Sequence, residues 1–395
     1  MTSPSPNLSH GPDTVAIPGP SIVPPRVLTA MARPMPDIYE GDLIDTSLEV
    51  AATLPGLVGT SGAAFVAIAN GHGGWEMALT NTLSRGDRVL VADCGLFATA
   101  WGDLARALGL DVELLRADDG RAVDPVQIGE YLAADTLRSI KAVLLVHVDT
   151  ASSIRNDLPA IRAAIDATGH PALLMVDAIA SIGCEPYRMD EWGIDVTISA
   201  SQKGLMTPPG LAFVWAGDRA WEAHDQAGLR TPYWDWLPRH DPPANYLRYC
   251  GTPPVSHLFA VREALAMIAE EGIDQVWARH AALARAVQAA VDAWAAPGGL
   301  TLWAREPAER ANSVTTIYTG AVDADLLDQI ARAELGVTLG IGLRAFAGNS
   351  FRIGHMGFVS AASLLGVLGV VETALLRLDA PLGASGVAAA AAALA

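Results

Sequence analysis

Two residues with complementary chemistry follow two separate apolar runs in the middle of the chain. Asp177 comes directly after the run at 173–176, and Lys203 comes shortly after the run at 195–199. A lysine amine can form a Schiff base with an aldehyde, and a carboxylate can hold the proton of a pyridinium ring. The pair therefore suits a cofactor that is both an aldehyde and a pyridine. The alternative is that Asp177 caps a helix and Lys203 lies on the surface.

Lysine is rare in this chain. Lys141 and Lys203 are the only lysines among the 26 basic residues counted as Lys and Arg. Composition bias of the source genome accounts for most of this preference for arginine. Because a guanidinium group does not deprotonate, a lysine kept against such a bias suggests amine chemistry that arginine cannot perform.

A glycine-rich turn lies earlier in the chain, at 70–74, with the sequence Asn-Gly-His-Gly-Gly. It follows an apolar run, and we expect a helix to begin near Trp75. Backbone amides at such a helix N-terminus can receive a phosphate group. The alternative is a tight turn without a ligand.

Arg352 lies in an apolar setting late in the chain, within the segment 349–357. A buried guanidinium is costly unless it meets an anion, and a carboxylate held by two parallel hydrogen bonds is a fitting partner. An internal salt bridge to Asp or Glu is the alternative. We interpret the nearby His355 as a packed histidine. Arg344 is either a solvated loop residue or a second anion site for a diacid.

The elements that must position these residues alternate between strands and helices. Apolar runs, which predict strands, occur at 65–68, 88–92, 142–148, 172–176 and 195–199, and Asp157 is placed to cap a helix between the third and the fourth. Strands that are apolar throughout favour a mostly parallel sheet covered on both faces. Such sheets bind ligands at the carboxyl ends of their strands, where Asp177 and Lys203 lie.

Composition and length bound the class of protein. The chain has 395 residues, 51% of them hydrophobic, and its formal net charge of −17 argues against nucleic-acid binding. Cys94, Cys184 and Cys250 are too few and scattered for a disulfide framework or a zinc site, and we predict no metal. No signal or membrane-spanning pattern is visible, so we expect a cytoplasmic protein that does not bind membranes.

The pattern of composition divides the chain into four parts. We expect an irregular proline-rich arm at 1–25, a large cofactor-binding domain at 26–255, a small C-terminal domain at 256–380, and a flexible tail at 381–395. The segment 231–254, rich in proline and aromatic residues, predicts a long irregular connection. Helices are predicted from Ser256 to about Glu271 and from about Asp274 to Trp294.

Several of these segments together resemble one family. The sequences Val-Asp-Ala-Ile-Ala-Ser-Ile-Gly at 176–183, Ile-Asp-Val at 194–196, Ser-Ala-Ser-Gln-Lys-Gly at 199–204 and Pro-Pro-Gly at 208–210 resemble the core of class V, fold-type I pyridoxal-phosphate (PLP) aminotransferases. The alanine/serine–glyoxylate branch is the nearest group. The turns at 71–72 and 95–97, the segment 249–252 and the motif at 352–354 follow in that family's order, and the resemblance covers about residues 14–378.

The resemblance implies a fold and an activity. The expected fold is α/β, with a mostly parallel seven-stranded sheet between helices in the large domain and a smaller α+β C-terminal domain. The expected enzyme is a PLP-dependent transaminase that moves an amino group from serine, alanine or aspartate to glyoxylate or a similar 2-oxo acid, by a ping-pong mechanism through a Lys203 aldimine.

The resemblance also implies a role for each matching residue. Lys203 would be the Schiff-base lysine and proton shuttle, Asp177 would pair with the pyridine nitrogen, and Arg352 would bind the substrate α-carboxylate. The remaining expected cofactor contacts are Asn70, Gly71, His72 and Gln202 at the phosphate, Phe97 and Ile179 on the two faces of the ring, Thr150 near the phenolic oxygen, and Tyr249 and Thr252 at the phosphate of the partner subunit. The last two imply a homodimer that shares its active sites.

The chain departs from the family pattern in two places. A Glu-Ser/Thr-Ser-Thr-Gly run is common in the family, whereas residues 149–153 read Asp-Thr-Ala-Ser-Ser; Thr150 keeps a hydroxyl and Ala151 loses one. The substrate-side segment that often reads His-Arg-Asp-Pro is replaced by the sequence at 35–40. The second departure leaves the preferred amino donor open.

Other functions remain as alternatives. The motif at 352–357 also resembles pyridoxamine–pyruvate aminotransferase, which acts on free pyridoxamine, although the turn at 70–72 favours a bound phosphate. A desulfurase needs a mobile nucleophilic cysteine, for which Cys250 is the candidate. A non-catalytic binding module would not need Lys203, Asp177 and Arg352 together. Sugar aminotransferases have no general need for the carboxylate contact of Arg352.

Overall fold

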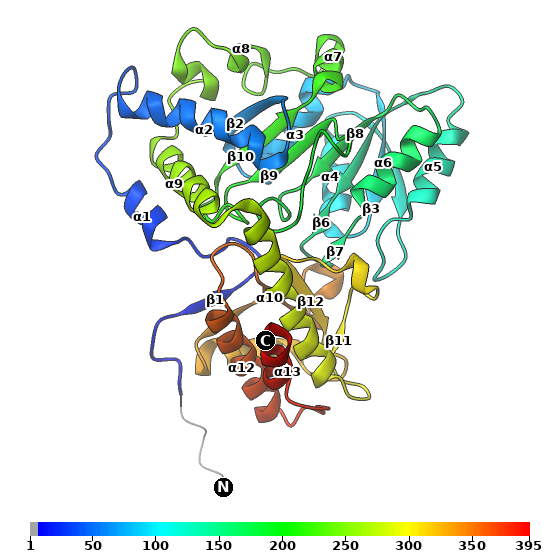
Figure 1. Cartoon of the computed structure of the whole chain (residues 1–395). Helices are drawn as coiled ribbons and strands as arrows, with labels where there is room; N and C mark the ends of the chain where they lie inside the picture. Colours follow the sequence, from blue (N-terminus) through cyan, green and yellow to red (C-terminus); the bar gives the residue numbers. More distant parts are fainter. Residues whose placement is uncertain (1–6) are drawn as a thin grey trace.

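A seven-stranded sheet lies between two layers of helices in the computed structural model, which describes residues 7–395 (Figure 1). β10 runs antiparallel to both of its neighbours, and the remaining strand pairs are parallel. In spatial order the strands are β2 (Ala63–Ala69), β10 (Gly210–Ala216), β9 (Val196–Ala200), β8 (Leu173–Asp177), β5 (Ile140–Val146), β3 (Arg88–Asp93) and β4 (Asp111–Arg116). The predicted α/β fold with a mostly parallel seven-stranded sheet is confirmed.

Two hydrophobic cores cover the two faces of this sheet, because successive residues of a strand point to opposite sides. In β3, for example, Leu90 belongs to one core, and Val89 and Val91 belong to the other. One core includes α2 (Asp42–Val58), α5 (Pro125–Ala134), α6 (Leu158–Ala167) and α9 (Val255–Glu271); the other includes α3 (Gly71–Thr82), α4 (Leu96–Ala107) and α7 (Asp218–Gln226).

A smaller five-stranded sheet forms the second domain, below the large one in Figure 1. Its strands in spatial order are β1 (Thr14–Ala16), β13 (Val337–Ile341), β14 (Ser350–Gly354), β12 (Val314–Tyr318) and β11 (Thr301–Leu302). Helix α10 (Ile273–Trp294) runs from the large domain into the small one. The small domain also holds α11 (Ala324–Gln329), α12 (Ala361–Arg377) and α13 (Gly386–Leu394).

Short elements complete the chain. A two-stranded hairpin of β6 (Val148–Asp149) and β7 (Ile154–Arg155) follows β5. Helix α1 (Pro25–Met31) packs against α9. The predicted irregular connection at 231–254 contains α8 (Leu237–His240) and a helical turn at Asn245–Tyr249; further helical turns lie at Pro307–Glu309, Ile330–Glu334 and Arg344–Phe346.

Each predicted strand and helix has a counterpart in the structure, but strands β4 and β10 were not predicted, and the two ends of the chain differ from the prediction. All five predicted apolar runs are strands of the large sheet, and the predicted helices are α6, α9 and α10, with Asp157 accepting a hydrogen bond from Ala160 N at 3.0 Å. The irregular arm, whose first six residues lie outside the described part, contains strand β1. This strand pairs with β13 in parallel, from Thr14 beside Val337 to Ala16 beside Leu339.

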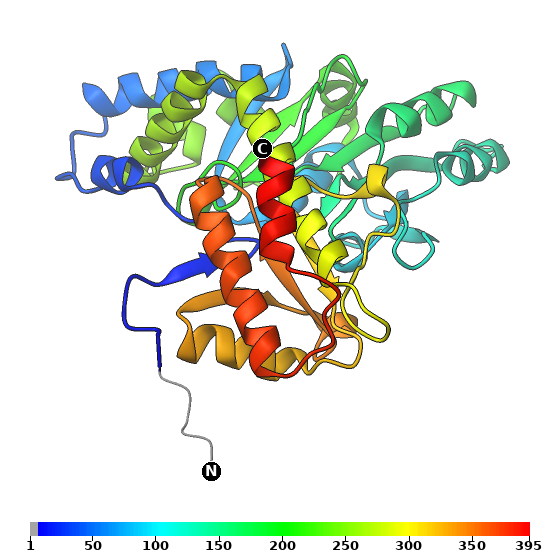
Figure 2. The same ribbon diagram turned by 60° about the horizontal axis from the view of Figure 1, so that its bottom comes forward.

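The predicted flexible tail at 381–395 is wrong, because the structure has helix α13 there. Alanine has the highest helix propensity, and Ser385 caps the helix by accepting a hydrogen bond from Ala388 N. The helix packs against α10 and α12, and Ala390 is buried (Figure 2). The buried face of α9 packs into the large-domain core, although we placed the domain boundary before it, at residue 255.

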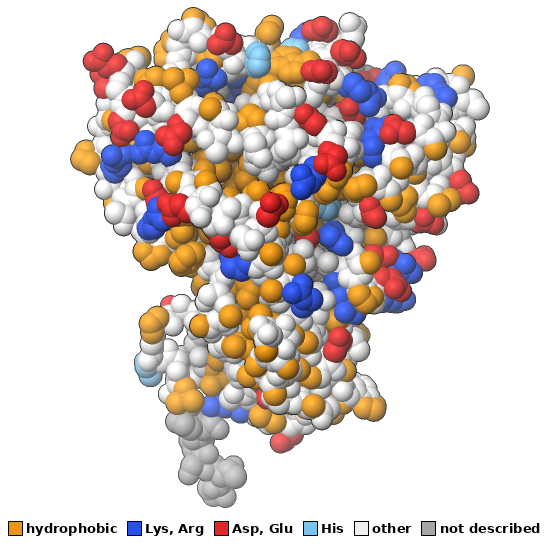
Figure 3. Space-filling view, in the orientation of Figure 1, with side chains coloured by type: hydrophobic (Ala, Val, Ile, Leu, Met, Phe, Trp, Pro, Cys, Tyr) orange, Lys and Arg blue, Asp and Glu red, His pale blue; other side chains and the backbone are white. Residues whose placement is uncertain are grey.

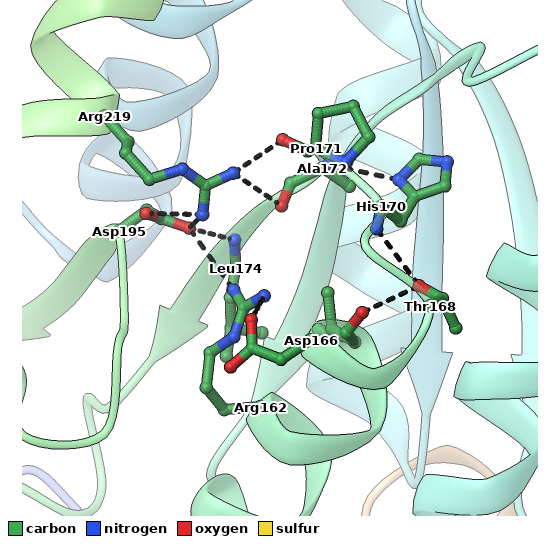
Figure 4. Close-up of polar contacts among 10 residues, drawn as sticks. Arg162, Asp166, Thr168, His170, Pro171, Ala172, Leu174, Asp195 and Arg219 are labelled. Atoms are coloured by element: carbon green, nitrogen blue, oxygen red, sulfur yellow. Dashed lines mark hydrogen bonds and ion pairs between the residues drawn. The ribbon is translucent and has the colours of Figure 1, made fainter.

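Asp195 ties together the first residues of the two strands that lead to the expected site (Figure 4). This buried carboxylate accepts a hydrogen bond from Leu174 N in β8 at 2.7 Å and pairs with Arg219 of α7 at 3.0 Å. Arg219 also donates to Pro171 O at 2.6 Å, and Arg162 of α6 lies 3.9 Å from the carboxylate. The network sets β8 beside β9, so their carboxyl ends lie together.

The surface carries acidic and basic side chains intermixed. On the face drawn in Figure 3 they gather over the large domain, and the small domain there is mainly hydrophobic or uncharged. Among residues 7–395, no helix is both long and apolar enough to cross a membrane.

Candidate active site

A cavity of about 190 Å³ lies at the carboxyl ends of β8 and β9. All the expected cofactor contacts line it except Tyr249 and Thr252. The lining residues are Asn70, Gly71, His72, Trp75, Phe97, Val148, Thr150, Asp177, Ile179, Ala180, Gln202 and Lys203. Residues from five segments, far apart in the sequence, are thus brought to one place by the sheet.

Lys203 lies in the turn after β9. Its amine donates a hydrogen bond to Pro18 O, from the N-terminal segment. Burial and the positive charge of Arg352 lower the pKa of the Lys203 amine from its ordinary value to about 8. Roughly a tenth of the amine is therefore unprotonated at pH 7 and about half at pH 8, and only that form can act as a nucleophile or base.

Asp177 is the last residue of β8 and is 3% exposed. One carboxylate oxygen, Oδ1, accepts a hydrogen bond from Ile179 N, and the other, Oδ2, accepts one from Trp75 Nε1, both at 2.8 Å. Burial raises the pKa of this carboxyl to about 7, and the two donors act in the opposite direction. The group is thus neither a helix cap nor a surface acid.

The glycine-rich turn is the N-terminus of α3, which begins at Gly71 rather than near Trp75 as expected. The helix starts earlier because the Asn70 side chain caps it, accepting from His72 N at 3.1 Å and Gly73 N at 3.4 Å. A phosphate at this end would compete with Asn70 Oδ1 for these amides. A Cβ at Gly71 would lie 2.3 Å from Ile179 Cδ1, so a side chain there would displace Ile179 at the cavity.

Asp149 holds the turn that carries Phe97. Its carboxylate is fully buried and accepts hydrogen bonds from Phe97 N at 2.7 Å, Ala151 N at 2.9 Å and Ser152 N at 3.2 Å. Burial raises the pKa of Asp149, and the backbone donors oppose this effect. The carboxylate thereby joins the first turn of α4 to the segment that bears Thr150.

Arg352 is 7% exposed and lies in β14 of the small domain. It donates through Nε to Ile341 O at 2.9 Å and through a terminal nitrogen to Thr150 O at 2.8 Å. Within residues 7–395 it forms no ion pair with a carboxylate, so the alternative of an internal salt bridge is wrong. Burial lowers the pKa of the Arg352 guanidinium to about 10.

Tyr249 and Thr252 are not brought to this cavity. The Tyr249 side chain is buried, and its hydroxyl hydrogen-bonds to Ser47 Oγ of α2. Thr252 is exposed. Their expected contact with the cofactor of a partner subunit stays a prediction.

The remaining candidate residues from the sequence, His355, Arg344 and the three cysteines, lie in different settings. His355 is buried, with its two nitrogens hydrogen-bonded to Thr315 Oγ1 and Asn312 O, as expected for a packed histidine. Arg344 is exposed and has no ion pair in the described part of the chain. Cys94 and Cys184 are buried, and Cys250 is exposed. No cluster able to hold a metal ion occurs among residues 7–395.

The sequence did not reveal the part that five residues play in the site. Trp75 and Asp149 hold Asp177 and the Phe97 turn, and Val148 and Ala180 line the cavity. Pro18 contacts the lysine. An acid directly after an apolar run, as at Asp149, is a usable signal, because the same pattern identified Asp177.

Comparison with known proteins places this geometry in a family. The family profile described as Aminotransferase class-V matches residues 59–359. The chain is 40% identical to a serine–glyoxylate aminotransferase of Methylorubrum extorquens over 91% of this chain and 90% of that protein. It is 38% identical to an L-aspartate–glyoxylate aminotransferase of Paracoccus denitrificans, over 95% and 94%.

A solved structure, that of pyridoxamine–pyruvate aminotransferase from Mesorhizobium loti, is similar with a TM-score of 0.89. It is 27% identical, and the match covers 99% of both chains. Since the family profile spans most of the chain and these relatives cover nearly all of it, the chain belongs to the class-V aminotransferase family.

Proposed function

We propose that this aminotransferase uses PLP to move an amino group from a small amino acid (serine, alanine or aspartate) to glyoxylate or a similar 2-oxo acid. The observation that carries the proposal is the meeting, in one cavity, of the Lys203 amine and the Asp177 carboxylate, with the buried cation of Arg352 close enough to lower the pKa of the amine. The relatives with about 40% identity support glyoxylate as the acceptor.

The residues of the cavity fit PLP. Lys203 supplies an amine for its aldehyde, Asp177 a buried carboxylate for its ring nitrogen, and the start of α3 amides for its phosphate. Gln202 Oε1 is buried without a hydrogen-bond partner among residues 7–395, and rotation of this amide by 180° would place its Nε2 donor there to meet a phosphate. When bound, PLP supplies an electron sink for the charge left on the substrate α carbon.

The side chains of this chain then have distinct tasks. The unprotonated form of Lys203 Nζ, which burial and the charge of Arg352 make more abundant, takes the α proton of the substrate and later gives it up. Asp177 keeps its negative charge toward the ring nitrogen. Arg352 binds the α-carboxylate, and because one substrate replaces the other in the same place, the kinetics are ping-pong.

Reductive trapping tests the assignment of Lys203. Borohydride treatment of the PLP-loaded protein should attach the cofactor mass to the peptide that contains Lys203 and leave Lys141 unmodified. The exposed Lys141 is the matched control, because it is the other lysine in the chain. Lys203→Ala should abolish turnover, while Lys141→Ala should keep it. Near-normal turnover of purified Lys203→Ala would reject the proposal.

A spectrum of the half-reaction tests the substrate. The loaded protein is titrated with single amino acids and no acceptor; the true donor should convert the cofactor to its amine form, and glyoxylate should restore the original band. The second candidate, pyridoxamine–pyruvate aminotransferase, rests on the structural similarity of 0.89 in TM-score. This second function predicts that amino acids leave the spectrum unchanged. It also predicts that free pyridoxamine and pyruvate are converted to pyridoxal and alanine.

We also propose a cytoplasmic homodimer in which Tyr249 and Thr252 reach the partner's site. Support comes from Thr252, which is exposed and lies outside the cavity of its own chain; Tyr249 would first have to leave its contact with Ser47. Two inactive variants, Lys203→Ala and Thr252→Ala, should regain activity when mixed and refolded together, because one site of each hybrid dimer is then intact. Absence of recovery in hybrid dimers isolated by differential tags would exclude sharing.

A further inference from the structure

Trp75 connects two parts of the cofactor cavity that sequence reasoning treated separately. It lies in the first turns of α3 and is fully buried. Its ring contacts that of His72, with centroids 4.4 Å apart, and stacks on Trp101 of α4 at 5.8 Å with an interplanar angle of 16°. The indole is therefore held on both sides and has little freedom to turn.

The held indole aims its N–H at Asp177. Trp75 Nε1 lies 2.8 Å from Asp177 Oδ2, and it is the side-chain donor to this carboxylate among the described residues. The other oxygen is satisfied locally by Ile179 N, two residues further on, in an Asx turn. The Ile179 amide is two residues from Asp177 in the same turn, whereas the Trp75 indole belongs to a different element, helix α3.

We propose that Trp75 is a positioning residue that orients the Asp177 carboxylate and holds it in its charged form for the ring nitrogen of the cofactor. The inference rests on the proposed use of PLP and deepens it. A hydrogen bond to a charged group favours that charged form, and here it does so in a buried setting where an unpaired carboxylate is costly.

Several groups around Asp177 stabilise or destabilise its charged form, and the hydrogen bond from Trp75 acts against those that destabilise it. Burial disfavours the anion, and the charge of Asp149 adds to this effect; Lys203 favours the anion. Burial and the charge of Asp177 raise the pKa of the Tyr187 phenol, whose hydroxyl shares a hydrogen bond with Thr197 Oγ1. Loss of the indole donor therefore leaves the Ile179 amide and Lys203 to stabilise the charge.

Trp101 provides a matched control within the same stack. Both indoles are buried and face each other, but Trp101 Nε1 has no hydrogen-bond partner in the described part of the chain. Packing alone would make the two tryptophans equivalent. A difference between Trp75→Phe and Trp101→Phe that depends on Asp177 therefore reports the hydrogen bond.

The first experiment uses the apoprotein and needs no cofactor. Asp177 titrates in the folded protein near pH 7 and in the unfolded chain near its ordinary value of 3.8, so the folded state binds more protons between these limits. The difference in Tm between the wild type and Asp177→Asn should fall as pH rises through this window and then become constant. In Trp75→Phe this fall should continue to higher pH, because loss of the indole donor raises the pKa of Asp177 further. In Trp101→Phe the fall should end at the same pH as in the wild type.

The second experiment measures PLP affinity by equilibrium dialysis. Trp75→Phe should weaken binding by about ten- to hundredfold in the wild-type background, the usual range for a hydrogen bond to a charged group, and by much less in the Asp177→Asn background. Trp101→Phe should show no such dependence. Equal effects of both substitutions in both backgrounds, in dialysis and in the apoprotein titration, would overturn the proposal.

If Trp75→Phe does not fold, the wild-type apoprotein decides the question. With ¹⁵N-labelled tryptophan, one indole N–H resonance should follow the titration of Asp177 and shift in Asp177→Asn; no such resonance would overturn the proposal. A protein that shows this coupling yet binds no PLP would separate a failure of the proposed function from a failure of this inference.

Discussion

At the scale of single residues, the site is a set of buried charges that shift one another's pKa values. Lys203 and Arg352 are neighbouring cations, and Asp149 and Asp177 are neighbouring anions, all largely removed from water. Burial lowers the pKa values of both cations and the charge of Arg352 lowers that of Lys203 further, so the lysine, whose ordinary pKa is lower, loses its proton first. Arginine thus keeps its charge for a substrate carboxylate while lysine becomes a base.

The depressed pKa of Lys203 makes the stability of the apoprotein depend on pH. The folded lysine titrates near pH 8 and the unfolded one near 10.5, so the unfolded state binds more protons between these values. The free energy of unfolding should therefore rise with pH across this window, by roughly 3 kcal/mol relative to Lys203→Met. Urea unfolding of both apoproteins from pH 7 to 10.5 measures the difference. Parallel curves of the free energy of unfolding against pH would contradict a lowered pKa of Lys203.

Removing the charge of Arg352 should affect both the binding of substrates and the pKa of Lys203. Arg352→Gln should raise KM for both substrates by about tenfold or more, because a charge-assisted hydrogen bond to the carboxylate is lost. It should also raise the pKa of Lys203, since a nearby cation is removed. Steady-state kinetics and the pH dependence of lysine modification measure the two effects. The exposed Arg344→Gln is the control, and a diacid donor affected by that control would reveal a second anion site.

At the scale of elements, the sequence predicts the strands that bear the chemistry better than the element ends. The runs that end at Asp177 and before Lys203 were recognised because buried parallel strands are apolar throughout. β4 was missed because its residues are only half-buried and mixed in polarity. The start of α3 was missed because Asn70 caps a glycine-rich first turn that lacks helix-forming residues.

The Asp195 network should be needed to keep β8 and β9 in place (Figure 4). Asp195→Asn weakens the contacts with Arg219 and Arg162 and leaves Arg219 without a carboxylate partner among residues 7–395, while Arg162 keeps Asp166. Because Arg219 is partly exposed, we expect a loss of about 1.5–3 kcal/mol in the free energy of unfolding. Denaturant unfolding measures it. Asp166→Asn removes the exposed partner of Arg162 and should cost less than 1 kcal/mol; equal losses would refute the network.

At the scale of the whole molecule, the N-terminal segment joins both domains across the site. Residues Thr14–Ala16 form an edge strand of the small domain's sheet, and Ser21 Oγ donates to Lys203 O at 2.7 Å in the large domain. No local sequence pattern predicts this path, because it is set by contacts with residues about 180 or more positions further along the chain. The same holds for Arg352, whose burial follows from the packing of two domains.

Gly19 is where this segment passes closest to the lysine, and its replacement tests the arrangement. Its φ of +97° disfavours any side chain, and a Cβ there would lie 2.5 Å from Lys203 Nζ. Gly19→Ala must therefore displace either the segment or the lysine. Since a misplacement of about 1 Å can lower rates about a hundredfold, we expect a loss of that order in kcat.

The matched control is Gly11→Ala, in the same segment, where an added Cβ has no atom within 4 Å. It should keep normal activity and stability. Borohydride trapping of Gly19→Ala separates the two displacements: a moved lysine traps PLP poorly, whereas a moved segment leaves trapping intact and raises KM. Normal kcat and KM in Gly19→Ala would mean that the segment does not position Lys203 in the working enzyme.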